Sequence, residues 1–217
     1  MKQIHKNKEP GELTRWNASR AGSDVPWEDL APEVRTALQQ SLLAEQGHVC
    51  CYCGRRLLPS DYHIEHLVPR NGPMGDASLT YVYQNLLASC QANLGRRDPR
   101  HCGTSKGDWY TAALMVSPLD PSCEARFSYD VDGKVRPRDP ADEGATETIM
   151  HLDLDGTRLR GLRLKVIEAL LDDLDRDLEP EERRVLLAAY AVRDAQGRFE
   201  PFGFVLAATL RFLYGDG

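Results

Sequence analysis

Four cysteines constrain the fold of this chain more than any other feature. Cys50 and Cys53 form a C-x2-C pair, and Cys90 and Cys102 follow with eleven residues between them. A structural zinc ion takes four ligands in a tetrahedron, and a C-x2-C turn supplies two of them at a suitable spacing. The second pair can complete the site if the residues between its members loop out. The spacing therefore predicts structural Zn2+ at these four cysteines.

Two other interpretations of the cysteines remain open at this point. A redox pair is typical of a strand–helix junction within an alternating β/α pattern. Here a helical pattern precedes Cys50, and no such alternation follows it. Inert buried thiols are the second alternative. Cys51 and Cys123 have no partner at a useful spacing, so we interpret both as buried or free thiols.

Composition sets outer limits on the class of protein. The 217 residues, 41% of them hydrophobic, suffice for one sizeable core. No apolar run is long enough to cross a membrane, and MKQIHKNKEP at the start lacks the apolar region of a secretory signal, which predicts a cytoplasmic protein without a membrane partner. A net charge of −6 argues against a generally basic nucleic-acid coat. Residues 48–108 nevertheless carry seven Lys/Arg against five Asp/Glu, which is compatible with local phosphate binding or with ordinary solvated charge.

The remaining pattern predicts an α+β protein, mostly helical, with a small site-bearing sheet. Pro32 suits the first turn of a helix that Gly47 would end, and Pro69 would close a short strand that begins near His63. Asp132-Gly133 predicts the turn of a hairpin. The predicted elements are an extended arm over 1–25, a helix over 32–46, strands within 63–69 and 81–90, a helix starting near 104, a hairpin over 127–137 and three helices within 153–217. We expect three regions: an arm and helix (1–47), a zinc-braced core (48–115), and a hairpin with helices for packing or docking (116–217).

The stretch DYHIEHLVPR, residues 61–70, lies inside the cysteine frame and carries candidate catalytic groups. His66 could act as a general base for hydrolysis of a phosphodiester. Glu65 would point to the opposite face of an ideal strand, unless a bend brought both side chains to one site. His63 and Glu65 share a face and could both bind a hard metal ion. Asn85 could hold a loop or an imidazole, although a surface histidine beside an acid and an asparagine in a turn are ordinary alternatives.

The order of these motifs resembles the HNH endonuclease family. The strand Glu65-His66-Leu67-Val68-Pro69 and the later Asn85-Leu86 match the family's motifs, between cysteines that match its zinc set. The resemblance implies a treble-clef-like ββα-metal site braced by Zn2+ at Cys50, Cys53, Cys90 and Cys102. It also implies that His66 is the general base, that Glu65 binds Mg2+ or Mn2+, and that Asn85 orients the base.

Softer patterns extend the resemblance to one branch of the family. Ile4…Glu9-Pro10…Leu13, CYCGRRL, FSYDVDGKV and HLDLDGTRLRGLR are similar to the HNH subunit of Septu-type anti-phage systems, which also accompanies some retrons. That branch implies an ABC-type ATPase as partner. One departure concerns the metal ligands, because Gly103 stands where the family often has asparagine. Candidates to replace it are His63, which shares a strand face with Glu65, and Asn93, His101 and Asp108.

The leading hypothesis is a metal-dependent endonuclease that cleaves DNA, with RNA as an open alternative. Four basic residues between or just after the second cysteine pair could contact phosphates, or could simply be solvated: Arg96, Arg97, Arg100 and Lys106. Gly103 favours a second hypothesis, a non-catalytic zinc module that binds nucleic acid or protein. The acidic segment 139–185, with fourteen Asp/Glu against seven Arg/Lys, favours a third, a scaffold that docks on a basic partner.

Overall fold

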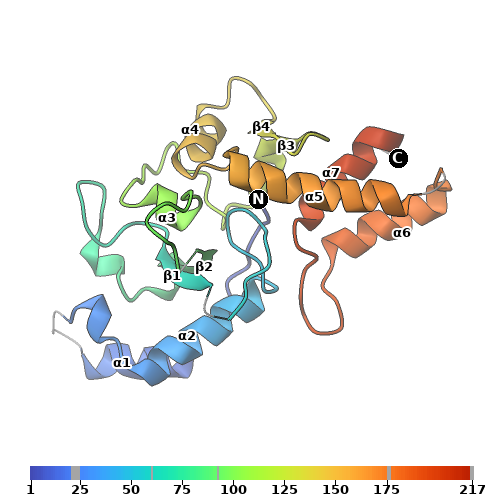
Figure 1. Cartoon of the computed structure of the whole chain (residues 1–217). Helices are drawn as coiled ribbons and strands as arrows, with labels where there is room; N and C mark the ends of the chain where they lie inside the picture. The colour runs from blue at the N-terminus through green and yellow to red at the C-terminus, as the bar shows by residue number, and fades with distance from the viewer. Residues whose placement is uncertain (21–24, 60, 92, 175–176, 216–217) are drawn as a thin grey trace.

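The computed structural model describes residues 1–20, 25–59, 61–91, 93–174 and 177–215 (Figure 1). Over these residues the chain forms helices and two small antiparallel sheets of two strands each. The predicted mixture of helices with a small sheet is thus confirmed. Among the described helices, none has the length and apolar character needed to span a bilayer.

The N-terminal region differs from the expected extended arm. Residues 11–19 form helix α1 (Gly11–Ser19), which packs on α2 (Pro32–Glu45) and buries Leu13 completely. The prediction was wrong there because one buried leucine in a polar stretch gives no helical periodicity. Helix α2 agrees with its prediction: Pro32 begins it, Val34, Leu38 and Leu42 are buried, and Gly47 follows it at a φ of 58°. A short 3-10 turn, η1 (Trp27–Asp29), connects the two helices.

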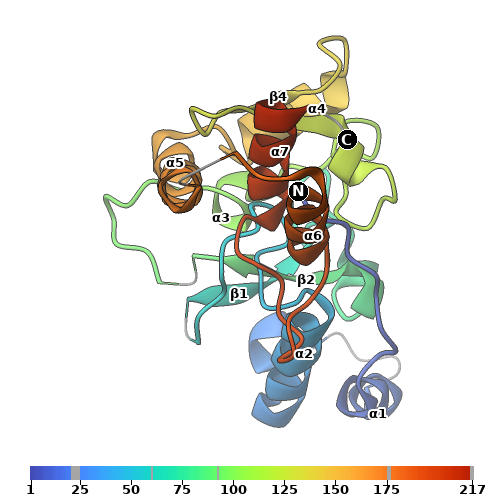
Figure 2. The same ribbon diagram turned by 90° about the vertical axis from the view of Figure 1, so that its right-hand side faces the viewer.

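The first sheet positions the candidate site. Strand β1 (Tyr62–His66) pairs antiparallel with β2 (Leu86–Cys90), so that Glu65 lies opposite Leu87. All five residues of β2 are buried. Figures 1 and 2 show α2 on one side of this sheet and the short helix α3 (Gly103–Lys106) on the other. A longer helix was expected after Thr104, but α3 ends at Lys106 because Gly107 adopts a left-handed φ of 53°.

The C-terminal half follows its prediction closely. The hairpin β3 (Phe127–Tyr129) and β4 (Val135–Pro137) turns at Gly133, whose φ is 74°. Helix α4 (Glu143–His151) was not predicted; its first turn is capped by the Asp142 side chain. The three expected helices are α5 (Thr157–Asp173), α6 (Pro180–Ala191) and α7 (Gly203–Tyr214), and α7 packs against both of the others.

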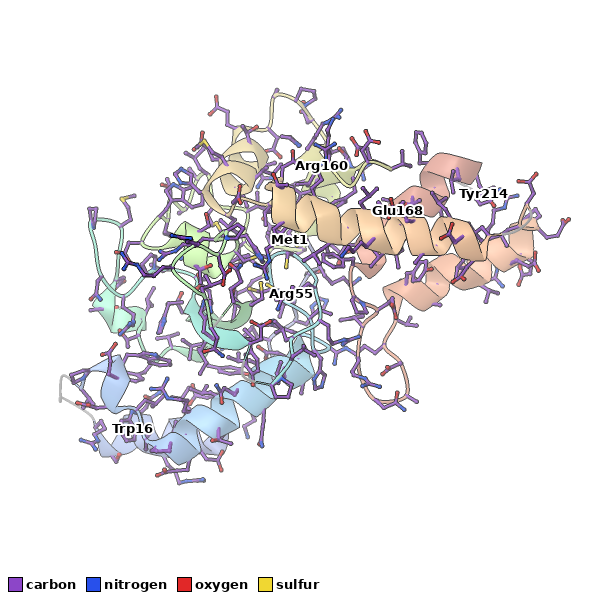
Figure 3. The ribbon with its side chains drawn as sticks, viewed as in Figure 1. Met1, Trp16, Arg55, Arg160, Glu168 and Tyr214 are labelled. Atoms are coloured by element: carbon purple, nitrogen blue, oxygen red, sulfur yellow. The ribbon has the colours of Figure 1, made fainter. Side chains whose placement is uncertain are left out.

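One hydrophobic core joins most of the chain. Buried residues from Met1 to Leu159 belong to a single cluster, so the N-terminal region, the first sheet and the hairpin pack on each other. Smaller clusters around Ile167 and Leu170 attach α7 to α5. In Figure 3 sulfur atoms gather near the labelled Arg55, well inside the molecule, while Trp16 and Tyr214 lie at opposite ends. The cysteine-bearing segments are therefore central to the packing.

Candidate functional site

The four cysteines of the predicted zinc site meet in the interior. Their sulfur atoms all lie within 4.8 Å of one another, and all four residues are buried. The Sγ atoms of Cys53 and Cys90 are 3.9 Å apart. Four thiolates around zinc at about 2.3 Å would be roughly 3.8 Å apart, so the arrangement fits a tetrahedral ion. Cys51 and Cys123 are also buried but lie outside this group, in agreement with the sequence interpretation.

Local backbone geometry brings the two cysteine pairs together. The C-x2-C turn is closed by a bridge between Val49 and Arg56, and Gly54 in the turn has a φ of 75°. Cys102 has a φ of 58°, which is unusual for a residue with a side chain, and its N–H donates to the carbonyl of Leu152 at 2.8 Å. The end of α4 therefore helps to hold Cys102 in the conformation that directs its sulfur to the cluster.

His101 lies beside the sulfur atoms instead of beside Glu65. Its Nδ1 atom is 3.2 Å from Sγ of Cys102 and 3.6 Å from Sγ of Cys90. Two other candidates to replace the asparagine expected at position 103, Asn93 and Asp108, have exposed side chains. The geometry favours the fourth candidate, His63, whose Nε2 atom lies 3.2 Å from Oε2 of Glu65.

His66 is held in one tautomer at the end of β1. Its Nε2 atom lies 3.0 Å from the carbonyl oxygen of Thr80, which can only accept, so Nε2 carries the proton and Nδ1 keeps a free lone pair. The Trp27 ring packs edge-on against the imidazole, with centroids 4.5 Å apart. Burial lowers the pKa of His66 to about 4, although the hydrogen bond to Thr80 opposes this shift. The ring is thus neutral at neutral pH and able to accept a proton.

Asn85 braces the loops around His66. Its Oδ1 atom accepts a hydrogen bond from the Val68 N–H at 2.8 Å, and its Nδ2 atom donates to the carbonyls of Val68 and Leu79. Asn85 thereby connects the turn after β1 to the residue before Thr80, whose carbonyl holds the imidazole. The sequence left two roles open for Asn85, holding a loop or holding an imidazole. Its side-chain hydrogen bonds are all to the backbone of the loops.

Glu65 is buried, and its two carboxylate oxygens have different partners. Oε2 lies 3.2 Å from Nε2 of His63, which confirms that these side chains share one face of β1. Oε1 accepts from the Tyr52 hydroxyl at 3.2 Å and lies 3.0 Å from Nζ of Lys106. Burial alone would raise the pKa of Glu65, but His63 and Lys106 outweigh it and hold that pKa below its ordinary value. The carboxylate is therefore ionised.

Gly103 approaches this pair so closely that no side chain fits there. A Cβ atom at position 103 would lie 2.3 Å from Oε2 of Glu65 and 2.8 Å from Nε2 of His63. His63 thus occupies the space into which an asparagine at position 103 would extend. Two ligands bound at right angles to one ion at about 2.1 Å are about 3.0 Å apart, close to the observed separation of these two atoms. His63 and Glu65 fit adjacent positions on a divalent ion.

A small polar cleft of about 180 Å³ opens beside Glu65 and His66. Glu65 and His66 both line it, although neighbouring residues of an ideal strand point to opposite faces. The cleft is lined by Ile64, Glu65, His66, Pro69, Arg70, Asn71, Lys106, Gly107 and Asp108.

The structure contradicts the expectation that Lys106 belongs to a solvated, phosphate-contacting loop. Its side chain is 1% exposed and ends against Glu65. No local pattern indicated this, because the partner of Lys106, Glu65, lies on a strand 41 residues earlier in the chain. Arg96, Arg97 and Arg100 are exposed, as a loop position predicts, and whether they contact phosphates stays a prediction.

Sequence reasoning also missed three residues that shape the site: Trp27, Tyr52 and Thr80. Trp27 reaches His66 from before α2, and Thr80 contributes only its carbonyl, so neither leaves a local pattern. Tyr52 had a usable signal. It lies between Cys51 and Cys53 in the C-x2-C turn, where a buried aromatic hydroxyl needs a polar partner. Through Tyr52 the cysteine turn directly contacts Glu65.

The depressed pKa of His66 predicts an acid-sensitive contribution to stability. An unfolded histidine titrates near 6.5, so as the pH falls from neutrality the unfolded state takes up a proton before the folded state does. Between about pH 7.5 and pH 5, we expect the free energy of unfolding to fall by about 2 kcal/mol more in the wild type than in His66→Gln. Denaturant unfolding of both proteins at the two pH values measures this difference. Equal pH responses would contradict the assigned pKa.

Comparison with known proteins gives one informative match. The chain is 32% identical over 143 residues to a protein of Vibrio cholerae serotype O1 biovar El Tor that is named as a candidate HNH endonuclease of retron Vc95. The aligned region covers 64% of this chain and 67% of that relative. No family model matches the sequence.

Proposed function

The chain belongs to the HNH endonuclease family, and we propose that it hydrolyses phosphodiester bonds of nucleic acid, with DNA as the favoured substrate. The observation that carries the proposal is the pairing, in one cleft, of a neutral His66 with a free Nδ1 lone pair and an ionised Glu65 beside His63. The braced site lies within the region 48–115, which we propose as the nuclease core.

His66 is the general base in this proposal. Nδ1 accepts a proton from a water molecule in the cleft, while the Thr80 carbonyl holds Nε2–H and stabilises the imidazolium that forms. The Trp27 ring keeps the imidazole from rotating. Asn85 acts as a positioning residue through the loops that it joins. The same base would act on DNA or RNA, because the scissile group is a phosphodiester in both.

Glu65 and His63 are the proposed protein ligands of a catalytic Mg2+ or Mn2+, and the four cysteines those of a structural Zn2+. An ion at the first site supplies charge stabilisation for the scissile phosphate and the leaving oxygen. One carboxylate is a sufficient anionic ligand for Mg2+ when a substrate phosphate and water molecules complete the shell. Zinc bound at the four cysteines would hold Tyr52 and Gly103 in place against Glu65, which is a positioning role.

A cleavage assay tests the proposed function. We expect zinc-loaded protein to cleave DNA in the presence of Mg2+ or Mn2+, to lose this activity in EDTA under conditions that leave the zinc bound, and to lose it in Glu65→Gln. RNA of the same sequence, run in parallel, identifies the substrate. Cleavage that is equal in Glu65→Gln, or that is indifferent to the divalent ion, would contradict the proposal.

His63 should influence which metal supports activity. Imidazole is a better ligand for Mn2+ than for Mg2+, so we expect His63→Ala to reduce cleavage more in Mn2+ than in Mg2+. Asn93→Ala serves as the matched control and should change little in either metal, because its side chain is exposed away from the cleft lining. Equal losses of activity in both metals for His63→Ala would remove His63 from the proposed ligand set.

We further propose that the chain is the nuclease subunit of an anti-phage defence complex of the Septu type, with an ABC-type ATPase as partner. Support comes from the retron name of the relative and from charge: a chain of net charge −6 is repelled by DNA, so a partner is needed to bring the substrate to the site. Arg96, Arg97 and Arg100 are the proposed phosphate contacts. Weak cleavage by the chain alone and strong cleavage with a co-purified ATPase are expected, and salt-tolerant cleavage without any partner would contradict this.

A further inference from the structure

Lys106 is a buried cation placed directly against the proposed metal ligand. Its ammonium group lies 3.0 Å from Oε1 of Glu65 and donates to the carbonyls of His66 and Gly107, each at 3.2 Å. All three acceptors belong to the protein, and the side chain is 1% exposed. The lysine is therefore an internal component of the site, and its position is fixed before any ligand arrives.

The charge of the site follows from this placement. Glu65 is the only carboxylate among the groups that contact His63 or Lys106 in the described residues, and the ammonium of Lys106 cancels its negative charge. Asp108 and Arg70, which also line the cleft, carry opposite charges. A divalent cation is thus offered a ligand set with no net negative charge, although magnesium sites usually combine one or two carboxylates with substrate phosphates. A bound phosphodiester is negatively charged and would supply the charge that this ligand set lacks.

We propose that Lys106 keeps the affinity of this site for a divalent ion low until a phosphodiester is bound, so that ion and substrate bind cooperatively. The inference rests on the proposed function of Glu65 as a metal ligand. Cooperativity of this kind is reciprocal: a phosphate that strengthens ion binding is itself bound more strongly when the ion is present. In the absence of nucleic acid, Lys106 neutralises Glu65 through Oε1, whereas Oε2 lies beside His63.

Tyr52 provides a matched control for the charge of Lys106. Its hydroxyl donates to the same carboxylate oxygen, Oε1 of Glu65, at 3.2 Å, but it is neutral. If the lysine only oriented the carboxylate, loss of either donor would change the affinity for the ion in the same direction. If its charge repels the ion, Lys106→Met should strengthen ion binding and Tyr52→Phe should not.

Binding of Mn2+ to the zinc-loaded full chain without nucleic acid, followed by the electron paramagnetic resonance signal of free Mn2+, tests the proposal. We expect Lys106→Met to bind Mn2+ at least tenfold more tightly than the wild type, Tyr52→Phe to stay within about twofold, and Lys106→Arg to resemble the wild type. Unchanged or weaker binding in a folded Lys106→Met protein overturns the inference. Circular dichroism of each variant monitors the fold, and Lys106→Gln replaces the methionine variant if that one does not fold.

A second measurement needs no change at Lys106. In the His66→Ala background, in which cleavage is expected to be slow, a bound DNA oligonucleotide should tighten Mn2+ binding at least tenfold, and no tightening overturns the inference. Glu65→Gln separates this inference from the proposed function. If that variant binds Mn2+ as the wild type does, the assigned metal site itself is wrong; if binding needs Glu65 but ignores Lys106, only the present inference fails.

Discussion

Replacing His66 with alanine is expected to lower the single-turnover rate of cleavage by roughly 10²–10⁴-fold, the range that a general base contributes. Nδ1 of His66 is the acceptor that the Thr80 carbonyl leaves free, and the Trp27 ring holds the imidazole in place. The loss should be chemical, because His66 lies outside the cysteine cluster. Rapid-quench measurement of cleavage at saturating enzyme gives the rate.

The control for this variant is His5→Ala, which removes an exposed histidine. Zinc content and the circular dichroism spectrum should match the wild type in both proteins. A His66→Ala variant that cleaves at the wild-type rate would exclude the assigned base, whereas one that loses zinc would point to a structural role.

The second large effect is expected from the cysteine cluster. Cys53→Ser should reduce bound zinc from about one ion per chain to a small fraction of that, and should unfold the region around the sheet, because structural zinc in small sites contributes roughly 10–16 kcal/mol of apparent binding free energy to folding. Elemental analysis and thermal unfolding measure the two consequences. The cluster occupies the centre of the main core, so its loss cannot remain local.

Cys123→Ala is the matched control, since Cys123 is equally buried but does not belong to the four-sulfur group. It should keep its zinc and lose only the stability that a small cavity costs. Full zinc content in Cys53→Ser would show that the cluster binds no zinc, and the interpretation as inert thiols would then stand.

The parts of the fold and site that depend on short-range sequence patterns could be predicted from the sequence. The C-x2-C turn and the helix begun by Pro32 depend on neighbours within a few residues, and both were found where expected. The strand expected over 63–69 was found as β1 (Tyr62–His66), which ends three residues before Pro69. The shared strand face of His63 and Glu65 followed from the two-residue period of a strand. The hairpin at Gly133 and the three last helices followed from equally local signals.

Other parts depended on contacts between distant segments and left no local pattern. Helix α1 is stabilised by burying Leu13 on α2, and Lys106 is buried against Glu65, a residue from a distant strand. The sequence analysis identified Gly103 as a departure from the family pattern, but it did not predict the close approach of Gly103 to Glu65. From the sequence, Gly103 indicated only that a metal ligand was missing. In the structure, the lack of a side chain at position 103 leaves room for the His63 imidazole.

The hydrogen bond from Cys102 to Leu152 has a consequence for the order in which the protein becomes competent during synthesis. All proposed catalytic residues and zinc ligands have left the ribosome once residue 102 has emerged. The Leu152 carbonyl, which holds Cys102 in its left-handed conformation, is synthesised some 50 residues later. A nascent chain thus carries all its reactive groups for a long interval without the brace that aligns them. The left-handed conformation of Cys102 therefore depends on a segment that follows it in the sequence, and a chain that ends before residue 152 lacks the hydrogen bond that holds it.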